Sequence, residues 1–368
     1  MDNRLVFKHP NIPTETLTVY DARKEPLHIY GLYQPQNEGL FRRMPAEVAE
    51  KVSKRVNLLH TNTAGARLRF VTDSTYIAVG AVYPPMEFPS ARTAAFAAAG
   101  AFSFDLYADG KYCRVLWPME LVQRGSVVSF DIPDGRYESF CDLGEKKLRE
   151  ITLNFPSFVN ISEVYIGLLQ GSVLKAAPEY MNKKPVVFYG SSITQGACAS
   201  HPGNIYQNIL SRKLNFDYLN LGFASGAKAE DAIIDYLCTL DMCMLVFDYD
   251  HNAKDLAFLK NTHLPALQKL RAAHPEIPFV VLSRPNRDPN EEQACDRAKL
   301  IEENCRIIAD EWDAPVHFVN GQAIFHSHDS EMMTIDGTHP TDLGFYCIAE
   351  SLCDLMATYL GESHAYYT

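Results

Sequence analysis

The stretch that most constrains the fold of this chain is residues 186–196, with the sequence VVFYGSSITQG. Its first five residues show no polar alternation, which is typical of a strand buried on both faces of a parallel sheet. The strand runs directly into a turn of small and hydroxyl residues. In open α/β sheets the loops at the carboxyl ends of the strands line the ligand crevice, so we expect Ser191, Ser192 and Thr194 at its floor.

Strand-like and helix-like segments alternate after this turn. Four further apolar strands are expected at residues 218–223, 243–249, 279–283 and 316–319. Helices are expected at residues 231–240, 256–270 and 343–360, the second with a break or kink at Pro265. Another helix is expected to follow a capping box of Asn290 and Gln293 and to extend to Trp312. This order predicts a three-layer α/β/α unit with a five-stranded parallel sheet of the flavodoxin-like kind.

The first half of the chain has a different pattern. From residue 15 to about residue 171, short β-favouring segments are separated by turn signals, and Asp109-Gly110 reads as a hairpin turn. A chain of 368 residues also exceeds what one hydrophobic core usually supports. We therefore predict an antiparallel β-sandwich at residues 1–175, a linker at 176–184 and the α/β unit at 185–368.

Charge and composition exclude several classes of function. The formal net charge of -11 argues against nucleic acid or an anionic membrane as the main partner, because both need a concentrated positive surface. No stretch approaches the roughly 18 apolar residues of a membrane span, and the amino terminus does not resemble a signal peptide, so we expect a cytoplasmic protein. The nine cysteines are scattered without a C-x-x-C pair, which favours buried thiols over zinc ligands or disulfides.

The second informative motif is DGTHP, residues 336–340, just before the last expected helix. In a D-x-x-H turn the carboxylate of Asp336 can hold one imidazole nitrogen of His339, so that the other nitrogen faces a nucleophile. A serine needs such a base, because its hydroxyl is a weak nucleophile at neutral pH. The alternative is an aspartate cap beside a surface histidine.

The two motifs together resemble the SGNH (GDSL-type) hydrolases. GSSITQG is similar to the first block of that family, with Ser191 in place of the more usual Asp, and the resemblance implies Ser192 as nucleophile. Asp336 and His339 stand where the family has its last block, which implies that His339 is the base and Asp336 its orienting group. Taken alone, the first turn also fits a phosphate-binding loop or a simple tight turn.

Two further blocks imply the oxyanion hole. Residues 250–253, DHNA, take the place of the family's G-x-N-D and make Asn252 the side-chain donor, unless it caps the next helix. Residues 220–226, NLGFASG, resemble the N-x-G-x-S-G block. Spacing puts the backbone donor at Ser225 and residue type puts it at Gly226, and a serine fits only if the turn does not require a positive φ. The N–H of Ser192 is the remaining donor.

Residues 104–107, FDLY, resemble the G-x-D-L-Y signature of a jelly-roll-like β-sandwich that precedes some SGNH hydrolases, with Ser103 in place of the glycine. The alternative is that Asp105 and Tyr107 are a structural pair within the sandwich.

The resemblance implies a serine esterase without a cofactor. The sandwich favours a short acyl group, acetyl, on a small-molecule or oligosaccharide ester. His251 and Arg284 are candidate substrate contacts, whereas His326, His328 and Asp329 fit a surface loop better than a metal site. The alternatives are a lipid or thioester acylhydrolase, a non-catalytic glycan-binding protein, and a phosphate or flavin binder.

Overall fold

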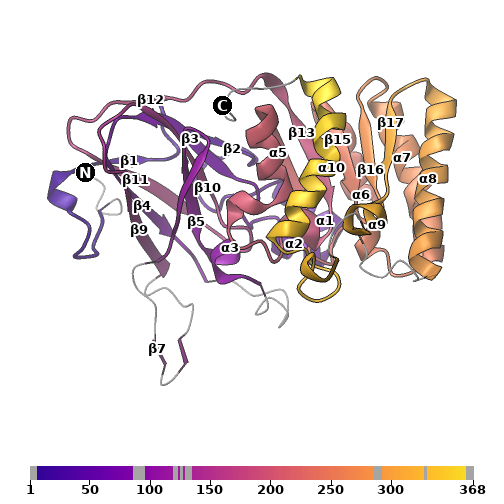
Figure 1. Ribbon diagram of the computed structural model, residues 1–368, viewed down its shortest axis with the longest axis horizontal. Coiled ribbons are helices and arrows are strands. Elements are labelled where there is room, and N and C mark those ends of the chain that lie inside the picture. The colour runs from indigo at the N-terminus through magenta and orange to yellow at the C-terminus, as the bar shows by residue number, and fades with distance from the viewer. Residues whose placement is uncertain are drawn as a thin grey trace.

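A computed structural model describes residues 6–85, 96–118, 123–124, 127–128, 135–285, 292–326 and 330–361. Figure 1 shows two units side by side along the long axis, one built of antiparallel sheets and the other of a parallel sheet covered by helices. The predicted fold class, an α/β unit preceded by a β-sandwich, is confirmed. The boundary between the two units stays a prediction.

The antiparallel unit consists of two sheets that enclose a core containing Leu68, Val79 and Ile166. The first sheet has the order β1 (Leu17–Asp21), β11 (Glu163–Leu169), β4 (Tyr76–Val82), β9 (Arg136–Asp142). The second has the order β12 (Leu174–Ala176), β3 (Arg67–Thr72), β10 (Arg149–Asn154), β5 (Phe104–Ala108), β6 (Lys111–Leu116), with β2 (His28–Tyr30) beside β3. A small ribbon of β7 (Gln123–Arg124) and β8 (Val127–Val128) projects from this unit.

The predicted hairpin at Asp109-Gly110 is confirmed. Strands β5 and β6 pair up to Ala108 and Lys111, which leaves a two-residue turn. Both turn residues have positive φ, 51° at Asp109 and 73° at Gly110. Such turns match the twist of a hairpin, and Asp and Gly tolerate the left-handed conformation well.

The parallel unit has the strand order β14, β13, β15, β16, β17, which is the flavodoxin-like order 2-1-3-4-5. The strands are β13 (Asn182–Gly190), β14 (Phe216–Gly222), β15 (Met244–Asp248), β16 (Phe279–Leu282) and β17 (Val316–Val319). The order in which strands are added to the sheet reverses at β13, which pairs in parallel with β14 on one side and with β15 on the other. Ligands of such sheets bind at the carboxyl end of this switch point, where Gly190 leads into the predicted nucleophile turn.

Helices cover both faces of the parallel sheet. One face packs against α5 (Tyr206–Leu214), α9 (Gly321–His326) and α10 (Asp342–Leu360). The other packs against α6 (Asp231–Thr239), α7 (Leu256–Ala273) and α8 (Glu292–Trp312). Val187 and Tyr189 belong to one core and Val186 and Phe188 to the other, which explains the continuous apolar run of β13. Of the break or kink expected at Pro265, the break is wrong, because α7 continues through it. The capping box at Asn290 and Gln293 lies outside the described side chains.

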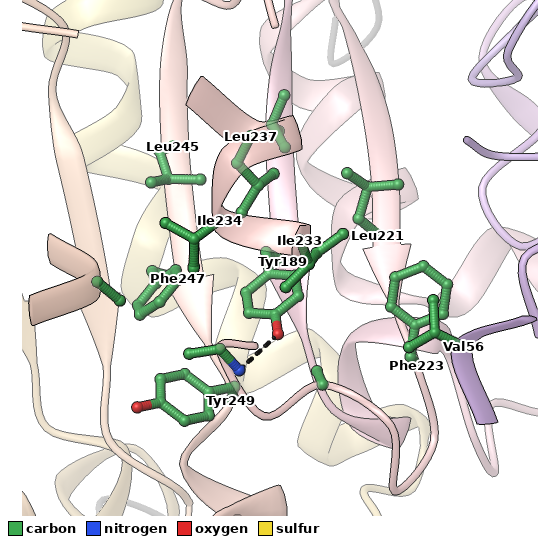
Figure 2. Close-up of a cluster of buried hydrophobic side chains, with 14 of the residues drawn as sticks. Val56, Tyr189, Leu221, Phe223, Ile233, Ile234, Leu237, Leu245, Phe247 and Tyr249 are labelled. Carbon is green, nitrogen blue, oxygen red and sulfur yellow. Dashed lines mark hydrogen bonds between the residues drawn. The ribbon is translucent and has the colours of Figure 1, made fainter. Parts of the chain in front are cut away.

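Two helices that the sequence did not predict, α1 (Ala46–Val52) and α2 (Lys54–Leu59), join the core of the parallel unit. Figure 2 shows Val56 of α2 beside Phe223, which follows β14. A segment from the first sixty residues therefore completes the packing of the second unit. The remaining short elements are η1 (Thr14–Thr16), α3 (Ala98–Phe102), α4 (Ser192–Gln195), η4 (Pro202–Asn204), η5 (Asp250–Asn252) and η6 (Ser330–Met332).

Among the residues that the structure describes, no helix combines the length and the apolar character needed to cross a membrane. The cytoplasmic location stays a prediction.

Candidate active site

The turn after β13 presents Ser192 as the first residue of the short helix α4. Ser191 caps this helix by accepting a hydrogen bond from the Ile193 N–H at 3.2 Å, and its own N–H donates to the Asp248 carbonyl at 3.1 Å. A side chain at Gly190 would come within 2.2 Å of that carbonyl, so only glycine fits here. The turn is therefore fixed from both sides, with the Ser192 hydroxyl partly exposed.

Ser191 and Thr194 do not lie on the surface of the crevice as expected, because both are fully buried. The Thr194 hydroxyl donates to Asp248 Oδ2 at 3.1 Å beneath the turn. Burial raises the pKa of the Asp248 carboxyl well above its usual value. These residues support the turn from below, and only Ser192 of the three reaches the crevice.

Ser192, His339 and Asp336 form one continuous chain of hydrogen bonds. Ser192 Oγ lies 2.9 Å from His339 Nε2, and His339 Nδ1 lies 2.8 Å from Asp336 Oδ2. Asp336 Oδ1 also accepts the N–H groups of Thr338 at 3.0 Å and His339 at 2.8 Å. Nucleophile, base and orienting carboxylate are thus in the order that acyl transfer to serine requires.

The Asp336 carboxylate is held in its charged form by its own loop. Burial acts to raise its pKa, but the backbone and imidazole of His339 and the Thr338 N–H outweigh this and lower the pKa below the usual value. Asp336 therefore stays ionised where most enzymes work and can accept the His339 Nδ1–H. The loop passes into α10, whose N-cap Thr341 accepts the Gly344 N–H at 3.3 Å.

The turn after β14 shows which backbone N–H is free to act as a donor, a choice between Ser225 and Gly226 that the sequence left open. Gly226 N–H donates to the Phe223 carbonyl at 2.8 Å, and Ala224 N–H donates to Gln195 Oε1 at 2.9 Å. Between them, the N–H of the exposed Ser225 has no acceptor among the described residues. The turn does require a positive φ at this residue, 58°, and the chain places serine there nonetheless.

Asn252 lies in η5, just after β15, and its Nδ2 donates one hydrogen to the Phe223 carbonyl at 3.1 Å. A side-chain amide carries two N–H groups, so the second stays available next to the same turn. The geometry brings Asn252, the Ser225 turn and the N-terminus of α4 to the same end of the sheet, as the proposed oxyanion hole requires.

The candidate substrate contacts His251 and Arg284 lie close to each other. Burial lowers the pKa of His251 to about 3, and the charges of Arg284, His339 and Arg297 act in the same direction. His251 is therefore a neutral imidazole at ordinary pH. The Arg284 backbone N–H donates to Asp250 Oδ2 at 2.9 Å, which ties the ends of β15 and β16 together.

Sequence reasoning missed three residues of the N-terminal half that reach the site. The Phe96 ring lies 6.0 Å from the His339 ring in an edge-to-face arrangement. Arg55 donates to the Ala224 carbonyl, and Arg43 donates to the Asn220 and Gly222 carbonyls. No signal in the sequence points to these contacts. The arginines bind residues more than 160 positions further along the chain, and Phe96 contacts a histidine near its far end.

The D-L-Y segment is more than a pair within the sandwich. The fully buried Asp105 binds Asn154 of its own unit at 2.7 Å, but its other oxygen accepts His201 Nδ1 at 2.6 Å and the Gly203 N–H at 2.5 Å from the parallel unit. Tyr107 contacts Arg212, whose guanidinium lies 4.4 Å from the ring centroid. The segment joins the two units.

Within the described residues, no group of three or more histidine, cysteine or acidic side chains is arranged to hold a metal ion. The side chains of His326, His328 and Asp329 lie outside the described residues.

Comparison with known proteins now gives the family. A model of the GDSL-like lipase/acylhydrolase family matches residues 183–357, and a model of the N-terminus of SGNH-hydrolase-type esterases, named GxDLY, matches residues 17–174. The two matches are adjacent and span nearly all of both units. No curated protein sequence matches the chain.

Solved structures with the same two-unit fold cover nearly the whole chain. One described as a GDSL-like lipase from Bacteroides ovatus is 23% identical, with a TM-score of 0.76 over 94% of this chain and 99% of that one. The salicylyl-acyltransferase SsfX3 of a tetracycline biosynthetic pathway is 20% identical, with a TM-score of 0.71 over 93% and 97%. A family two carbohydrate esterase from Cellvibrio japonicus is 11% identical, with a TM-score of 0.58 over 94% and 98%. At these identities the likeness shows a common fold.

Proposed function

The chain belongs to the GDSL-like lipase/acylhydrolase family, in its form with an N-terminal GxDLY unit, and we propose that it is a serine esterase that removes a short acyl group, acetyl, from a carbohydrate. One observation carries this proposal. Ser192 Oγ, His339 and Asp336 are linked by hydrogen bonds of 2.9 and 2.8 Å at the carboxyl end of the switch-point strand.

In the proposed mechanism Ser192 Oγ attacks the acyl carbon while its proton passes to His339 Nε2. Asp336 stabilises the imidazolium that forms. Negative charge develops on the carbonyl oxygen, which accepts hydrogen bonds from the N–H groups of Ser192 and Ser225 and from the Asn252 amide. His339 then donates its proton to the leaving alcohol oxygen, which leaves an acyl-serine. A water molecule, deprotonated by His339, hydrolyses this ester and restores the free serine.

The preference for a short acyl group is supported by the aromatic surroundings of the base. Phe96 packs at 4.7 Å from Phe158 and at 6.0 Å from His339, so rings from the N-terminal unit occupy space beside the triad. The preference for a carbohydrate rests on likeness of architecture: neighbours with the same two-unit fold include the Cellvibrio enzyme and an acetyl xylan esterase from Butyrivibrio proteoclasticus, at a TM-score of 0.57 and 11% identity.

The test is hydrolysis of p-nitrophenyl acetate, butyrate and octanoate, followed by acetylated xylo-oligosaccharide, by the wild type and Ser192→Ala. We expect acetate to be the best ester and its turnover to fall by about 10⁴-fold or more in the variant. Ser351→Ala, which removes an exposed serine hydroxyl on α10, is the matched control and should behave as the wild type.

Each alternative predicts a different result in this experiment. A preference for octanoate would favour the lipid or thioester acylhydrolase. A folded wild type that binds the oligosaccharide but turns over no ester would favour the glycan-binding protein. Turnover that survives in Ser192→Ala would exclude this serine as nucleophile.

A further inference from the structure

The turn at residues 223–226, called the oxyanion turn below, contains the proposed donor Ser225 and is hydrogen-bonded by a side chain of the N-terminal half. Arg55, on α2, donates from Nε to the Ala224 carbonyl at 2.9 Å. Its side chain packs closely on the turn: a Cβ at Gly226 would lie 3.1 Å from Phe223 Cβ, 3.2 Å from Arg55 Cγ and 3.4 Å from Val56 Cγ2. The backbone of Gly226 does not have a positive φ, so the glycine there makes room for the side chains of Phe223 and Arg55 rather than providing a left-handed residue.

The contact with Ala224 matters because of which peptide it holds. The Ala224 carbonyl and the Ser225 N–H belong to one peptide group, which is planar and trans, so they point in opposite directions. A donor that fixes the oxygen on the α2 side therefore aims the N–H toward the opposite side, where the described residues supply no acceptor. A hydrogen bond from a charged guanidinium is also stronger than a neutral one and polarises the peptide it binds.

Neighbouring contacts fix the position of the same turn. Arg43 Nη1 donates to the carbonyls of Asn220 at 2.8 Å and Gly222 at 2.6 Å, at the end of β14. The Arg43 guanidinium also lies 4.6 Å from the centroid of the Phe223 ring. On the other side, Gln195 of α4 accepts the Ala224 N–H at 2.9 Å, which couples the turn to the nucleophile helix.

Both arginines are available as cations at neutral pH. Burial lowers the pKa of Arg43 to about 9, and it also lowers the pKa of Arg55 below the usual value for arginine. Arg43 is almost completely buried, and no carboxylate lies within ion-pair distance of it among the described residues. Its guanidinium donates to four backbone carbonyls, those of Asn220 and Gly222 at the end of β14 and those of Leu59 and Asn62 at and just after the end of α2.

We propose that Arg55 is a positioning residue of the oxyanion hole, which holds and polarises the Ala224–Ser225 peptide so that the Ser225 N–H faces the developing negative charge. This inference rests on the proposed function, because it assigns Arg55 a part in the same acyl transfer. It gives the segment containing α2 a direct role in the chemistry of the other unit.

The test compares Arg55→Met, which removes the donor and keeps the length of the side chain, with Arg55→Lys and with Lys54→Met. Lys54 is an exposed neighbour on α2, so its replacement removes a positive charge without touching the turn. Steady-state hydrolysis of p-nitrophenyl acetate gives kcat and KM, and inhibition by phenylboronic acid reports how well the site binds a tetrahedral anion.

Loss of a complete oxyanion donor lowers kcat by roughly 10² to 10³-fold, and a donor that is present but poorly aimed should cost less. We expect Arg55→Met to lower kcat by roughly 10 to 100-fold with KM within about twofold of wild type, and to weaken boronate binding in parallel. Arg55→Lys should recover part of the loss, and Lys54→Met should match the wild type.

Wild-type kcat in Arg55→Met, or a raised KM at unchanged kcat, would overturn the assignment. If Arg55→Met does not fold, Arg55→Lys decides: reduced kcat with weaker boronate binding supports the role, and wild-type values of both contradict it. The proposed function fails separately, because it is judged by whether wild-type turnover is lost in Ser192→Ala. If the wild type is active and Arg55→Met has wild-type kcat, the proposed esterase function stands and only the role of Arg55 is excluded.

Discussion

The two halves of the proposed catalytic apparatus, the acid–base residues and the oxyanion turn, are held in place in different ways. The acid–base half, Ser192 with the loop of Asp336 and His339, is fixed mainly by contacts within residues 183–357: a cap at Ser191, a bond to Asp248, and backbone N–H groups within the loop. The oxyanion turn is fixed largely by Arg43 and Arg55, from far upstream.

This difference indicates how the two units divide the work. Proton transfer depends on tautomer and distance, which a short loop with its own hydrogen bonds can set. Stabilising an oxyanion depends on donors that are oriented in advance, and a turn with a left-handed serine at its centre needs external support to stay in one conformation. If both proposals hold, the N-terminal half acts mainly on the electrostatic part of the site.

The largest effect should come from breaking the acid–base half at its carboxylate. Asp336→Asn keeps an oxygen for the loop N–H groups but turns an N–H toward His339 Nδ1, which favours the wrong tautomer. We expect kcat for p-nitrophenyl acetate to fall by up to about 10⁴-fold. Asp354→Asn, an exposed aspartate on α10, is the control, and an active Asp336→Asn would exclude this carboxylate from the triad.

The next effect comes from the side-chain donor of the oxyanion half. Asn252→Ala removes the amide that is anchored on the Phe223 carbonyl, and we expect kcat to fall by roughly 10² to 10³-fold at similar KM. Asn261→Ala, at an exposed position of α7, should leave both constants unchanged. An equal loss in the two variants would mean that Asn252 acts only through stability.

A smaller effect should follow from loosening the contact between the units on the acid–base side. Asp105 holds residues 201–203, and the adjoining Ser200 binds Asp342, three residues after His339, at 2.8 Å from its N–H to Oδ1. Asp105→Asn should lower kcat by about tenfold through a displaced His339 loop. Asp217→Asn, which breaks the ion pair with Arg67 elsewhere between the units, should lower the melting temperature without changing kcat.

The smallest effect concerns the serine of the oxyanion turn. Ser225 has a φ of 58°, a conformation that costs a non-glycine residue about 1 kcal/mol or more. Ser225→Gly should raise the free energy of unfolding in urea by about 1 kcal/mol and keep kcat within twofold, because the backbone N–H remains. Ser225→Ala should show no such gain. A large fall of kcat in Ser225→Gly would assign a role to the hydroxyl instead.

The parallel sheet could be predicted from sequence because its central strands β13, β15 and β16 carry apolar runs that are buried on both faces. Residues 316–319 were expected as a strand and form β17, and the last helix was expected within one residue of its actual start at Asp342. The sandwich strand β3 is harder to recognise, because Arg67 and Arg69 interrupt its apolar pattern. Both are buried in the structure, at 1% and 4% exposure, since Arg67 pairs with Asp217 of the other unit and Arg69 with Glu150.

The candidate triad could be located from sequence because each of its parts lies in a short turn with a recognisable pattern, GSSITQG and DGTHP. The choice between Ser225 and Gly226 could not be made, since it depends on which N–H of the turn is already used. The helices α1 and α2 were missed because each is only six or seven residues long and is stabilised by packing against the other unit.

From the sequence alone we could predict the family, the order of strands and helices in the second half, and the candidate residues for the acid–base chemistry. All of these follow from patterns within a few consecutive residues. The folded chain was needed to show that Arg43 and Arg55 bind carbonyls in and just before the turn at residues 223–226, that Phe96 packs beside His339, and that Asp105 joins the two units. Each of these contacts closes a loop of roughly a hundred residues or more, and neither partner carries a local signal of the other.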